Sequence, residues 1–117
     1  MKTLIALLST GKGTWGHVNR LIQDGKYEKV VLLTNEYGKE NFQKNESTEL
    51  VPLNFNQGIK ELRDEIIKIL KNIKEPEVEV NIVSGTGKEH TALIAALLKS
   101  GIGIRLVALT KDGIEEI

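Results

Sequence analysis

The chain has no cysteine and no net charge, and each absence excludes a class of function. Without cysteine there is no disulfide framework, no thiolate nucleophile and no thiolate metal site, which fits a reducing cytoplasm. The 16 basic and 16 acidic residues balance, so no global field attracts duplex nucleic acid or anionic lipid. No apolar run approaches the roughly 20 residues that span a bilayer. We therefore predict a cytoplasmic protein that neither enters a membrane nor binds duplex nucleic acid.

The length of 117 residues suffices for one hydrophobic core, but not for a catalytic domain and an effector domain together. We therefore expect residues 1–117 to form a single domain. The short apolar run Leu4–Leu8 ends in Ser-Thr-Gly rather than in a small-residue cleavage site, so we predict a strand and not a signal. The many Lys, Glu and Ile residues, with a single Met, are typical of thermophile proteins.

Apolar runs alternate with helical patterns along the whole chain. We predict strands at residues 3–9, 29–34, 49–53, 78–84 and 105–109, and helices at 15–25, 35–44, 57–73 and 90–98. Pro52 places the third strand at an edge, and a short acidic tail follows the last strand. Short connections and right-handed crossovers then predict a Rossmann-like, doubly wound α/β fold, with a mostly parallel five-stranded sheet and helices on both faces. In the usual strand order, the first and fourth strands are central neighbours.

Two glycine-rich loops follow these two strands. The first reads Ser9-Thr10-Gly11-Lys12-Gly13-Thr14 and the second reads Ser84-Gly85-Thr86-Gly87-Lys88-Glu89. Loops that leave parallel strands and enter helices point free backbone N–H groups, and the positive end of the helix dipole, at one crevice. Lys12 and Lys88 add mobile positive charge there. We therefore predict a single pocket for a phosphate or nucleotide, with Asn35, after the second strand, as a weaker contact.

Neither loop fits a standard nucleotide motif. In the second loop Gly85 stands only two positions before Gly87, and Glu89 occupies the place of a magnesium-binding hydroxyl, which argues against a P-loop NTPase. The first loop has Gly-x-Gly-x-x-Gly spacing, but Thr34-Asn35 rather than an acidic residue ends the second strand. The alternative to a ligand site is that these glycines only let strand and helix pack closely.

Five further side chains suggest either a structural role or a chemical one. Trp15 is expected in the core, with stacking on a base as the alternative. His17 and His90 lack a second imidazole or carboxylate three or four residues later, so we predict no metal site and no cofactor. Beside His90, Glu89 is expected to cap the helix, with acid–base chemistry as the alternative. Arg105 within the last apolar run predicts a sheet edge, a buried ion pair or a subunit contact.

With both loops taken together, the chain resembles the CRISPR-associated Rossmann-fold (CARF) domain. The resemblance rests on Leu-Leu-Ser-Thr-Gly-Lys-Gly-Thr after the first strand and Ser-Gly-Thr-Gly-Lys-Glu-His-Thr-Ala-Leu after the fourth. It implies a homodimer that binds a cyclic oligoadenylate between two copies of the crevice. The ligand-binding residues expected on this basis are Gly11, Lys12, Gly13, Thr14, Asn35, Ser84, Gly85, Thr86 and Gly87. CARF proteins usually carry a nuclease or winged-helix effector, and none fits in this chain.

Some CARF domains also cleave their own ligand, by attack of a ribose 2′-hydroxyl on the adjacent phosphate without a metal. The resemblance implies that Lys88, with Ser9 or Thr10, would stabilise the charge in that step. A second hypothesis is a Rossmann-like enzyme or binding protein for a mononucleotide or sugar phosphate, with one ligand per subunit. A third is a binding module that acts through a partner chain carrying the effector.

Overall fold

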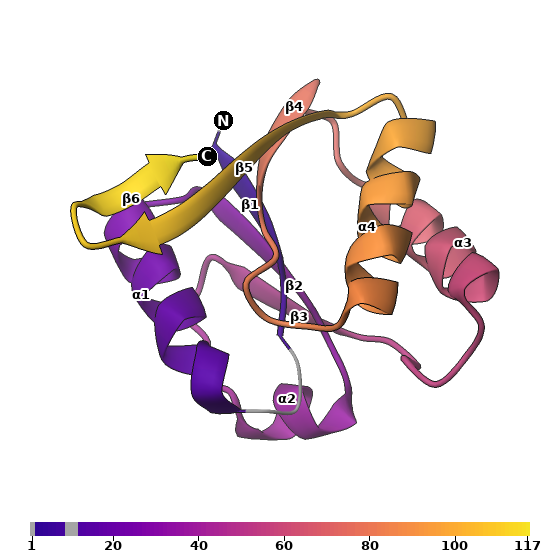
Figure 1. The fold of residues 1–117 in the computed structure, drawn as a ribbon, viewed down its shortest axis with the longest axis horizontal. Coiled ribbons are helices and arrows are strands. Elements are labelled where there is room, and N and C mark those ends of the chain that lie inside the picture. Colours follow the sequence, from indigo (N-terminus) through magenta and orange to yellow (C-terminus); the bar gives the residue numbers. More distant parts are fainter. Residues whose placement is uncertain (1, 9–11) are drawn as a thin grey trace.

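The computed structural model, which describes residues 2–8 and 12–117, has a Rossmann-like α/β fold built on one six-stranded sheet (Figure 1). The strand order is β3-β2-β1-β4-β5-β6. The first five strands are parallel, and β6 is antiparallel to β5. The strands are β1 (Thr3–Leu7), β2 (Lys29–Thr34), β3 (Thr48–Pro52), β4 (Glu77–Asn81), β5 (Gly103–Thr110) and β6 (Gly113–Glu116).

Helices cover both faces of the sheet. They are α1 (Trp15–Gly25), α2 (Glu36–Asn41), α3 (Ile59–Leu70) and α4 (Gly87–Lys99), and a 3-10 turn, Lys12–Thr14, precedes α1. In Figure 1, α1 lies on one side of the sheet, and α3 and α4 lie on the other. Two apolar clusters follow from this layering: one joins α1 to the sheet, and the other joins α3 and α4 to it. Every residue of β1 is buried because both of its faces are covered.

The predicted strand order is confirmed, with β1 and β4 as central neighbours and β3 at an edge. In the parallel pairing of β1 with β4, Ile5 lies opposite Val80 and Ala6 lies opposite Asn81. Pro52 ends β3, where the missing N–H of proline is tolerated at the edge of the sheet.

The predicted number of strands was wrong, because the expected acidic tail forms β6. The chain reverses at Lys111 and Asp112, and Gly113, the first residue of β6, has a φ of 108° that glycine adopts without strain. Arg105 therefore does not mark an edge strand or a buried ion pair: its half-exposed side chain pairs with Glu77 of β4 and with Glu116 of β6. Both carboxylates raise the pKa of Arg105, so it stays charged.

The fourth strand is shorter than predicted and ends at Asn81 rather than near residue 84. Asn81 is fully buried, and its Nδ2 donates a hydrogen bond to the Val107 carbonyl at 2.8 Å. The backbone pairing of β4 with β5 ends one residue earlier, at Val80 and Leu106. The Asn81 side chain therefore supplies the next hydrogen bond to β5 in place of a backbone group. Among the described residues, each helix is too short or too polar to cross a bilayer.

Candidate functional site

The second glycine-rich loop lies against the end of β1. Because β1 and β4 are parallel neighbours, their carboxyl ends meet at the same rim of the sheet. Gly85 has a φ of 110°, and a Cβ added there would lie 3.3 Å from Leu7 Cδ1, at the last residue of β1. The predicted convergence of the two strand ends is therefore present in the described part of the chain.

The second loop leads directly into the N-terminus of α4, which a capping box holds in place. Thr86 Oγ1 accepts a hydrogen bond from the Glu89 N–H, and the Glu89 carboxylate accepts one from the Thr86 N–H at 3.0 Å. The prediction that Glu89 caps the helix is confirmed. Gly87 and Lys88 form the first turn, where N–H groups have no acceptor within the helix. These two N–H groups and the helix dipole are what this end of α4 offers to an anion.

Lys88 connects the second loop to a segment that the sequence did not single out. Its exposed Nζ donates a hydrogen bond to the Gln57 carbonyl at 2.6 Å, between β3 and α3. The Gln57 side chain in turn donates to the Glu65 carboxylate of α3. The ammonium group is thus held at the rim of the sheet, and it keeps further donors because it has three. Only the tertiary structure brings Gln57 to this place.

Asn35 begins α2, and a cavity opens beside it. The Asn35 side chain accepts a hydrogen bond from the Gly38 N–H at 2.9 Å, so the amide oxygen caps this short helix. The cavity has a volume of about 440 Å³ and lies at the carboxyl ends of β2 and β3. Its lining residues are Asn35, Glu36, Pro52, Leu53, Asn54, Phe55 and Asn56. It supplies amide groups and an aromatic ring on the same rim as the second loop.

Ser84 and the two histidines form hydrogen bonds that fix the backbone around the site. Ser84 is fully buried, and its carbonyl accepts a hydrogen bond from His90 Nε2 at 3.1 Å, which fixes the turn before α4. His17 Nε2 accepts from the Leu109 N–H at 3.3 Å and lies 3.4 Å from Asn81 Nδ2. His17 therefore links α1 to β4 and β5, and His90 links α4 to the turn that precedes it. Within the part of the chain that is described, no three His, Asp or Glu side chains gather as metal ligands do.

The first loop is described only from Lys12 onward. Ser9, Thr10 and Gly11 lie outside the described residues, so their part in the site stays a prediction. Gly13 has open space where a Cβ would stand, and Thr14 precedes α1 without a side-chain capping bond. The strand end before this loop is anchored to β2, because Thr34 Oγ1 donates to the Leu8 carbonyl at 2.9 Å.

Trp15 packs with two aromatic residues near the start of α1. Its ring centroid lies 5.7 Å from that of Phe42 and 6.0 Å from that of Tyr37, and it contacts the core cluster beneath α1. The expectation that Trp15 packs in the core is confirmed, although the side chain is only partly buried. Tyr37, on α2, remains 41% exposed.

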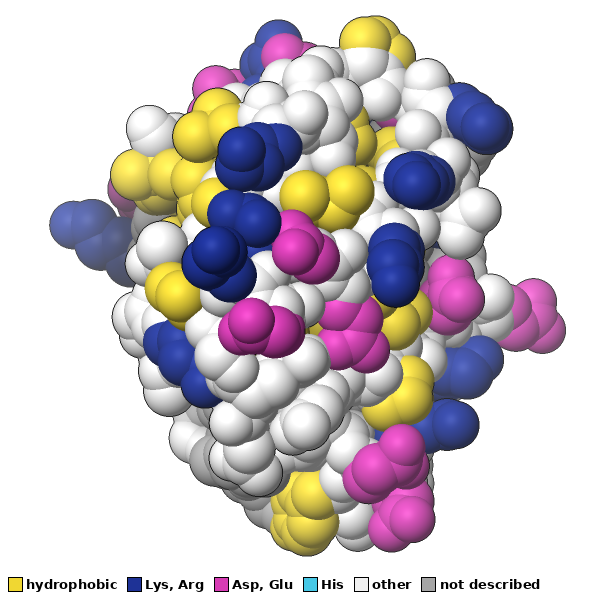
Figure 2. Space-filling model, turned by 90° about the vertical axis from the view of Figure 1, so that its right-hand side faces the viewer, with side chains coloured by type: hydrophobic (Ala, Val, Ile, Leu, Met, Phe, Trp, Pro, Cys, Tyr) yellow, Lys and Arg dark blue, Asp and Glu magenta, His cyan; other side chains and the backbone are white. Residues whose placement is uncertain are grey.

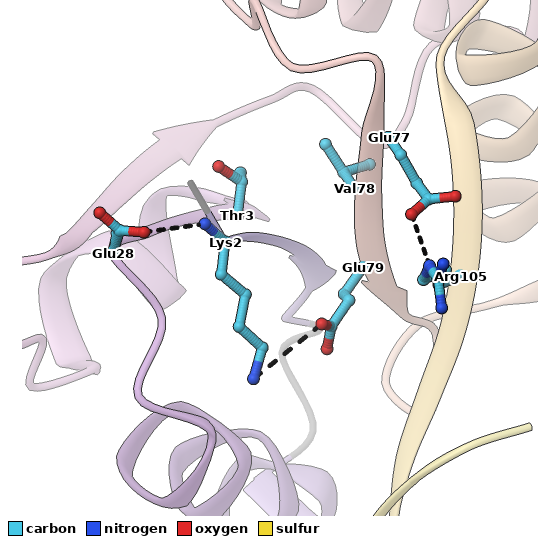
Figure 3. A pocket seen from close by; sticks show the side chains of 7 residues that line it. All are labelled: Lys2, Thr3, Glu28, Glu77, Val78, Glu79 and Arg105. Carbon is cyan, nitrogen blue, oxygen red and sulfur yellow. Dashed lines mark hydrogen bonds and ion pairs between the residues drawn. The ribbon is translucent and has the colours of Figure 1, made fainter.

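A second cavity of about 440 Å³ lies at the opposite end of the sheet (Figure 3). Its two cations are already neutralised: Lys2 pairs with Glu79 and its N–H donates to Glu28, while Arg105 pairs with Glu77. Three carboxylates facing two cations do not attract an anion. The cavity beside Asn35 is lined by one carboxylate, Glu36, and by no cation, so neither cavity by itself attracts a phosphate.

Comparison with known proteins supports the fold. No family model matches the chain, and no curated protein matches it. A solved structure of Enterococcus italicus Csm6 bound to cyclic hexa-2′-fluoro-hexa-dAMP is similar, with a TM-score of 0.59 at 15% sequence identity. The match covers 95% of this chain and 34% of that chain, so this chain spans about a third of the Csm6 length. At this identity the likeness shows a shared Rossmann-like architecture over nearly the whole chain.

Proposed function

We propose that the chain binds a cyclic oligoadenylate in a crevice between its two glycine-lysine loops, and that two copies of the crevice meet in a homodimer. The position of Gly85 beside Leu7 supports this proposal most directly, because it brings the second glycine-rich loop next to β1, the strand that leads into the first glycine-rich loop. The similar Csm6 structure contains a cyclic oligoadenylate analogue, which favours a nucleotide of this class. A ligand with two-fold symmetry would then contact the same groups in each subunit.

The charges at the two ends of the sheet support an anionic ligand at the carboxyl end. There the first turn of α4 offers N–H groups, and the nearby Lys88 ammonium is bonded to a neutral carbonyl rather than to a carboxylate. The adenine rings of the ligand would contact Phe55 and the amides of Asn54 and Asn56, which line the cavity beside Asn35. This cavity is where the proposal places part of the ligand.

The proposal includes cleavage of the bound ring as its second step. The ribose 2′-oxygen bonds to the adjacent phosphorus while the bond from phosphorus to the 5′-oxygen breaks, which leaves a 2′,3′-cyclic phosphate. The 2′-hydroxyl proton passes to solvent, and the departing 5′-oxygen takes one up. Lys88, with Ser9 or Thr10, would stabilise the charge on the phosphate and hold the reacting atoms in line.

Calorimetric titration with cyclic tetra-adenylate and cyclic hexa-adenylate tests binding, and chromatography of the mixture tests cleavage. We expect one ring per two chains. One ligand per chain, with a preference for a mononucleotide or a sugar phosphate, would support the other hypothesis. If neither ring binds and no linear product forms, the proposal is wrong.

The substitution Lys88→Ala separates a binding role from a packing role. Its Nζ is exposed and makes one bond to a backbone carbonyl, so the free energy of unfolding should fall by less than about 1 kcal/mol. Loss of a charged contact to phosphate should weaken ring binding by roughly 10- to 100-fold. Lys99→Ala, at the exposed far end of α4, is the matched control and should change neither quantity. A large fall in melting temperature with unchanged binding would show that Lys88 serves packing.

A further inference from the structure

The two helical sides of the molecule offer different kinds of contact. Figure 2 shows the side of α3 and α4, where hydrophobic side chains are exposed among basic and acidic ones. The groove between these two helices is lined by Lys60 and Arg63 as well as by Ile59, and a surface of that mixture favours no single kind of partner. On the side of α1, by contrast, His17 forms specific hydrogen bonds with β4 and β5. Its partner in β4, Asn81, precedes the second glycine-rich loop, whereas His17 follows the first.

Beyond the end of β4, the strand β5 needs other polar partners. Backbone pairing of the two strands stops at Val80 and Leu106, and the Leu106 carbonyl accepts a hydrogen bond from the N–H of Ile117, which follows β6. Because neighbouring residues of a strand point their backbone groups in opposite directions, Val107 and Leu109 face the side that β4 has left. The Val107 carbonyl and the Leu109 N–H therefore need partners other than a backbone strand.

Asn81 and His17 supply those partners and also contact each other. Asn81 Nδ2 donates to the Val107 carbonyl at 2.8 Å, and His17 Nε2 accepts from the Leu109 N–H at 3.3 Å. Asn81 Nδ2 also lies 3.4 Å from His17 Nε2, to which its second hydrogen is available. Since Nε2 meets two donors, it is the acceptor of the ring, and the proton of the neutral imidazole belongs on Nδ1.

The same hydrogen bonds connect the surroundings of the two glycine-rich loops. Asn81 Oδ1 accepts from the Val83 N–H at 3.4 Å, and Val83 directly precedes Ser84, which is fully buried. At the other end of the connection, His17 lies in the first turn of α1, whose N-cap Thr14 makes no side-chain capping bond. One buried amide therefore joins the start of α1 to the segment that leads into the second loop.

We propose that His17 is a positioning residue for the ligand site, because through Asn81 it sets the distance between the start of α1 and the second glycine-rich loop. The inference rests on the proposed function, in which a ligand bound between the two loops is held by groups from both. Misplacement of such groups by about 1 Å costs roughly 100-fold in a comparable catalytic case. The acceptor at Nε2, rather than the bulk of the ring, provides this positioning, so an amide oxygen in the same place should substitute for it.

Substitutions of His17 separate the acceptor from the bulk of the side chain. His17→Leu keeps the bulk and removes the acceptor, whereas His17→Gln places an amide oxygen close to the position of Nε2. In calorimetric titrations with cyclic tetra-adenylate and cyclic hexa-adenylate, His17→Leu should raise the dissociation constant roughly 10- to 100-fold, and His17→Gln should stay close to the wild type. Gln23→Leu removes a polar group from an exposed position of the same helix and is the matched control, which should bind as the wild type does.

Nuclear magnetic resonance measures the same connection without a ligand. In the ¹⁵N-labelled wild type, His17 should show the tautomer with its proton on Nδ1, a measurement that needs no variant to fold. The backbone amide signals of Val83 and Gly85 should shift in His17→Leu and return close to their wild-type positions in His17→Gln.

Three results would overturn the inference: a proton on His17 Nε2, loop amides and ring affinity that are unchanged in His17→Leu, or a His17→Gln protein as impaired as His17→Leu. The last result would show that the imidazole acts through its packing. If the tautomer and the amide shifts are as expected but the wild type binds neither ring, the proposed function fails while the connection between α1 and the second loop stands.

Discussion

Gly85 and Gly87 lie in the same glycine-rich segment, and the structure predicts that alanine lowers stability at Gly85 but not at Gly87. At Gly85 the φ of 110° is unfavourable for any residue with a Cβ. An added Cβ would also lie 3.0 Å from Glu89 Oε1, 3.2 Å from His90 Nε2 and 3.3 Å from Leu7 Cδ1. At Gly87, the first residue of α4, a Cβ would meet nothing within 4 Å.

The expected cost of Gly85→Ala has two parts. Placing alanine in a left-handed conformation costs about 1–2 kcal/mol, and crowding against three packed atoms adds about 1–2 kcal/mol. The free energy of unfolding should therefore fall by about 2–4 kcal/mol, which corresponds to roughly 8–16 °C in melting temperature for a domain of this size. Gly87→Ala should change stability by less than about 0.5 kcal/mol, or raise it slightly, because alanine favours the helix.

Urea unfolding followed by circular dichroism measures both variants against the wild type. Gly85→Ala should also disturb the capping box, since the Glu89 carboxylate is its nearest obstacle, and should weaken nucleotide binding together with stability. If Gly85→Ala unfolds at the same urea concentration as Gly87→Ala, the second loop does not rest on β1 as described. The proposed crevice would then lose its main support.

Two further substitutions test the frame around the site. Asn81→Leu removes the buried amide that donates to the Val107 carbonyl, so the free energy of unfolding measured by urea titration should fall by about 2–4 kcal/mol. Asn72→Leu, at an exposed position, is the control and should have almost no effect. Burial of Tyr27, its hydrogen bond to Glu79 and the negative charge of Glu79 all raise the pKa of Tyr27 above its usual value of 10. Tyr27 therefore stabilises the fold below pH 10, and this contribution to the free energy of unfolding is lost as the pH rises further. Tyr27→Phe should therefore cost about 1–2 kcal/mol near neutral pH, and the difference from the wild type should narrow above pH 10; a difference that is constant with pH would contradict this.

Much of the fold follows from short-range patterns. The near-continuous apolar runs of β1 and β2 predict strands covered on both faces, and the helical spacing after residue 14 predicts α1 with its observed bounds. The hairpin of β5 and β6 was missed, although Asp112-Gly113 indicates it, because the acidic residues that follow favour a tail. The early end of β4 could not be predicted, since the side-chain bond of Asn81 to β5 depends on a strand that is distant in the chain.

The sequence by itself determined the helices and the parallel strands, their order along the chain and the presence of a glycine-lysine loop after β4, because these depend on backbone preferences and on hydrophobic periodicity. It did not determine which loop side chains serve the fold. Ser84 reads like Thr86 in the sequence, yet the former is fully buried and the latter caps α4. The meeting of Lys88 with Gln57, and the exposure of Leu98, were likewise decided only in three dimensions. Such contacts join segments whose proximity depends on the packing of the whole sheet and its helices, which no local pattern encodes.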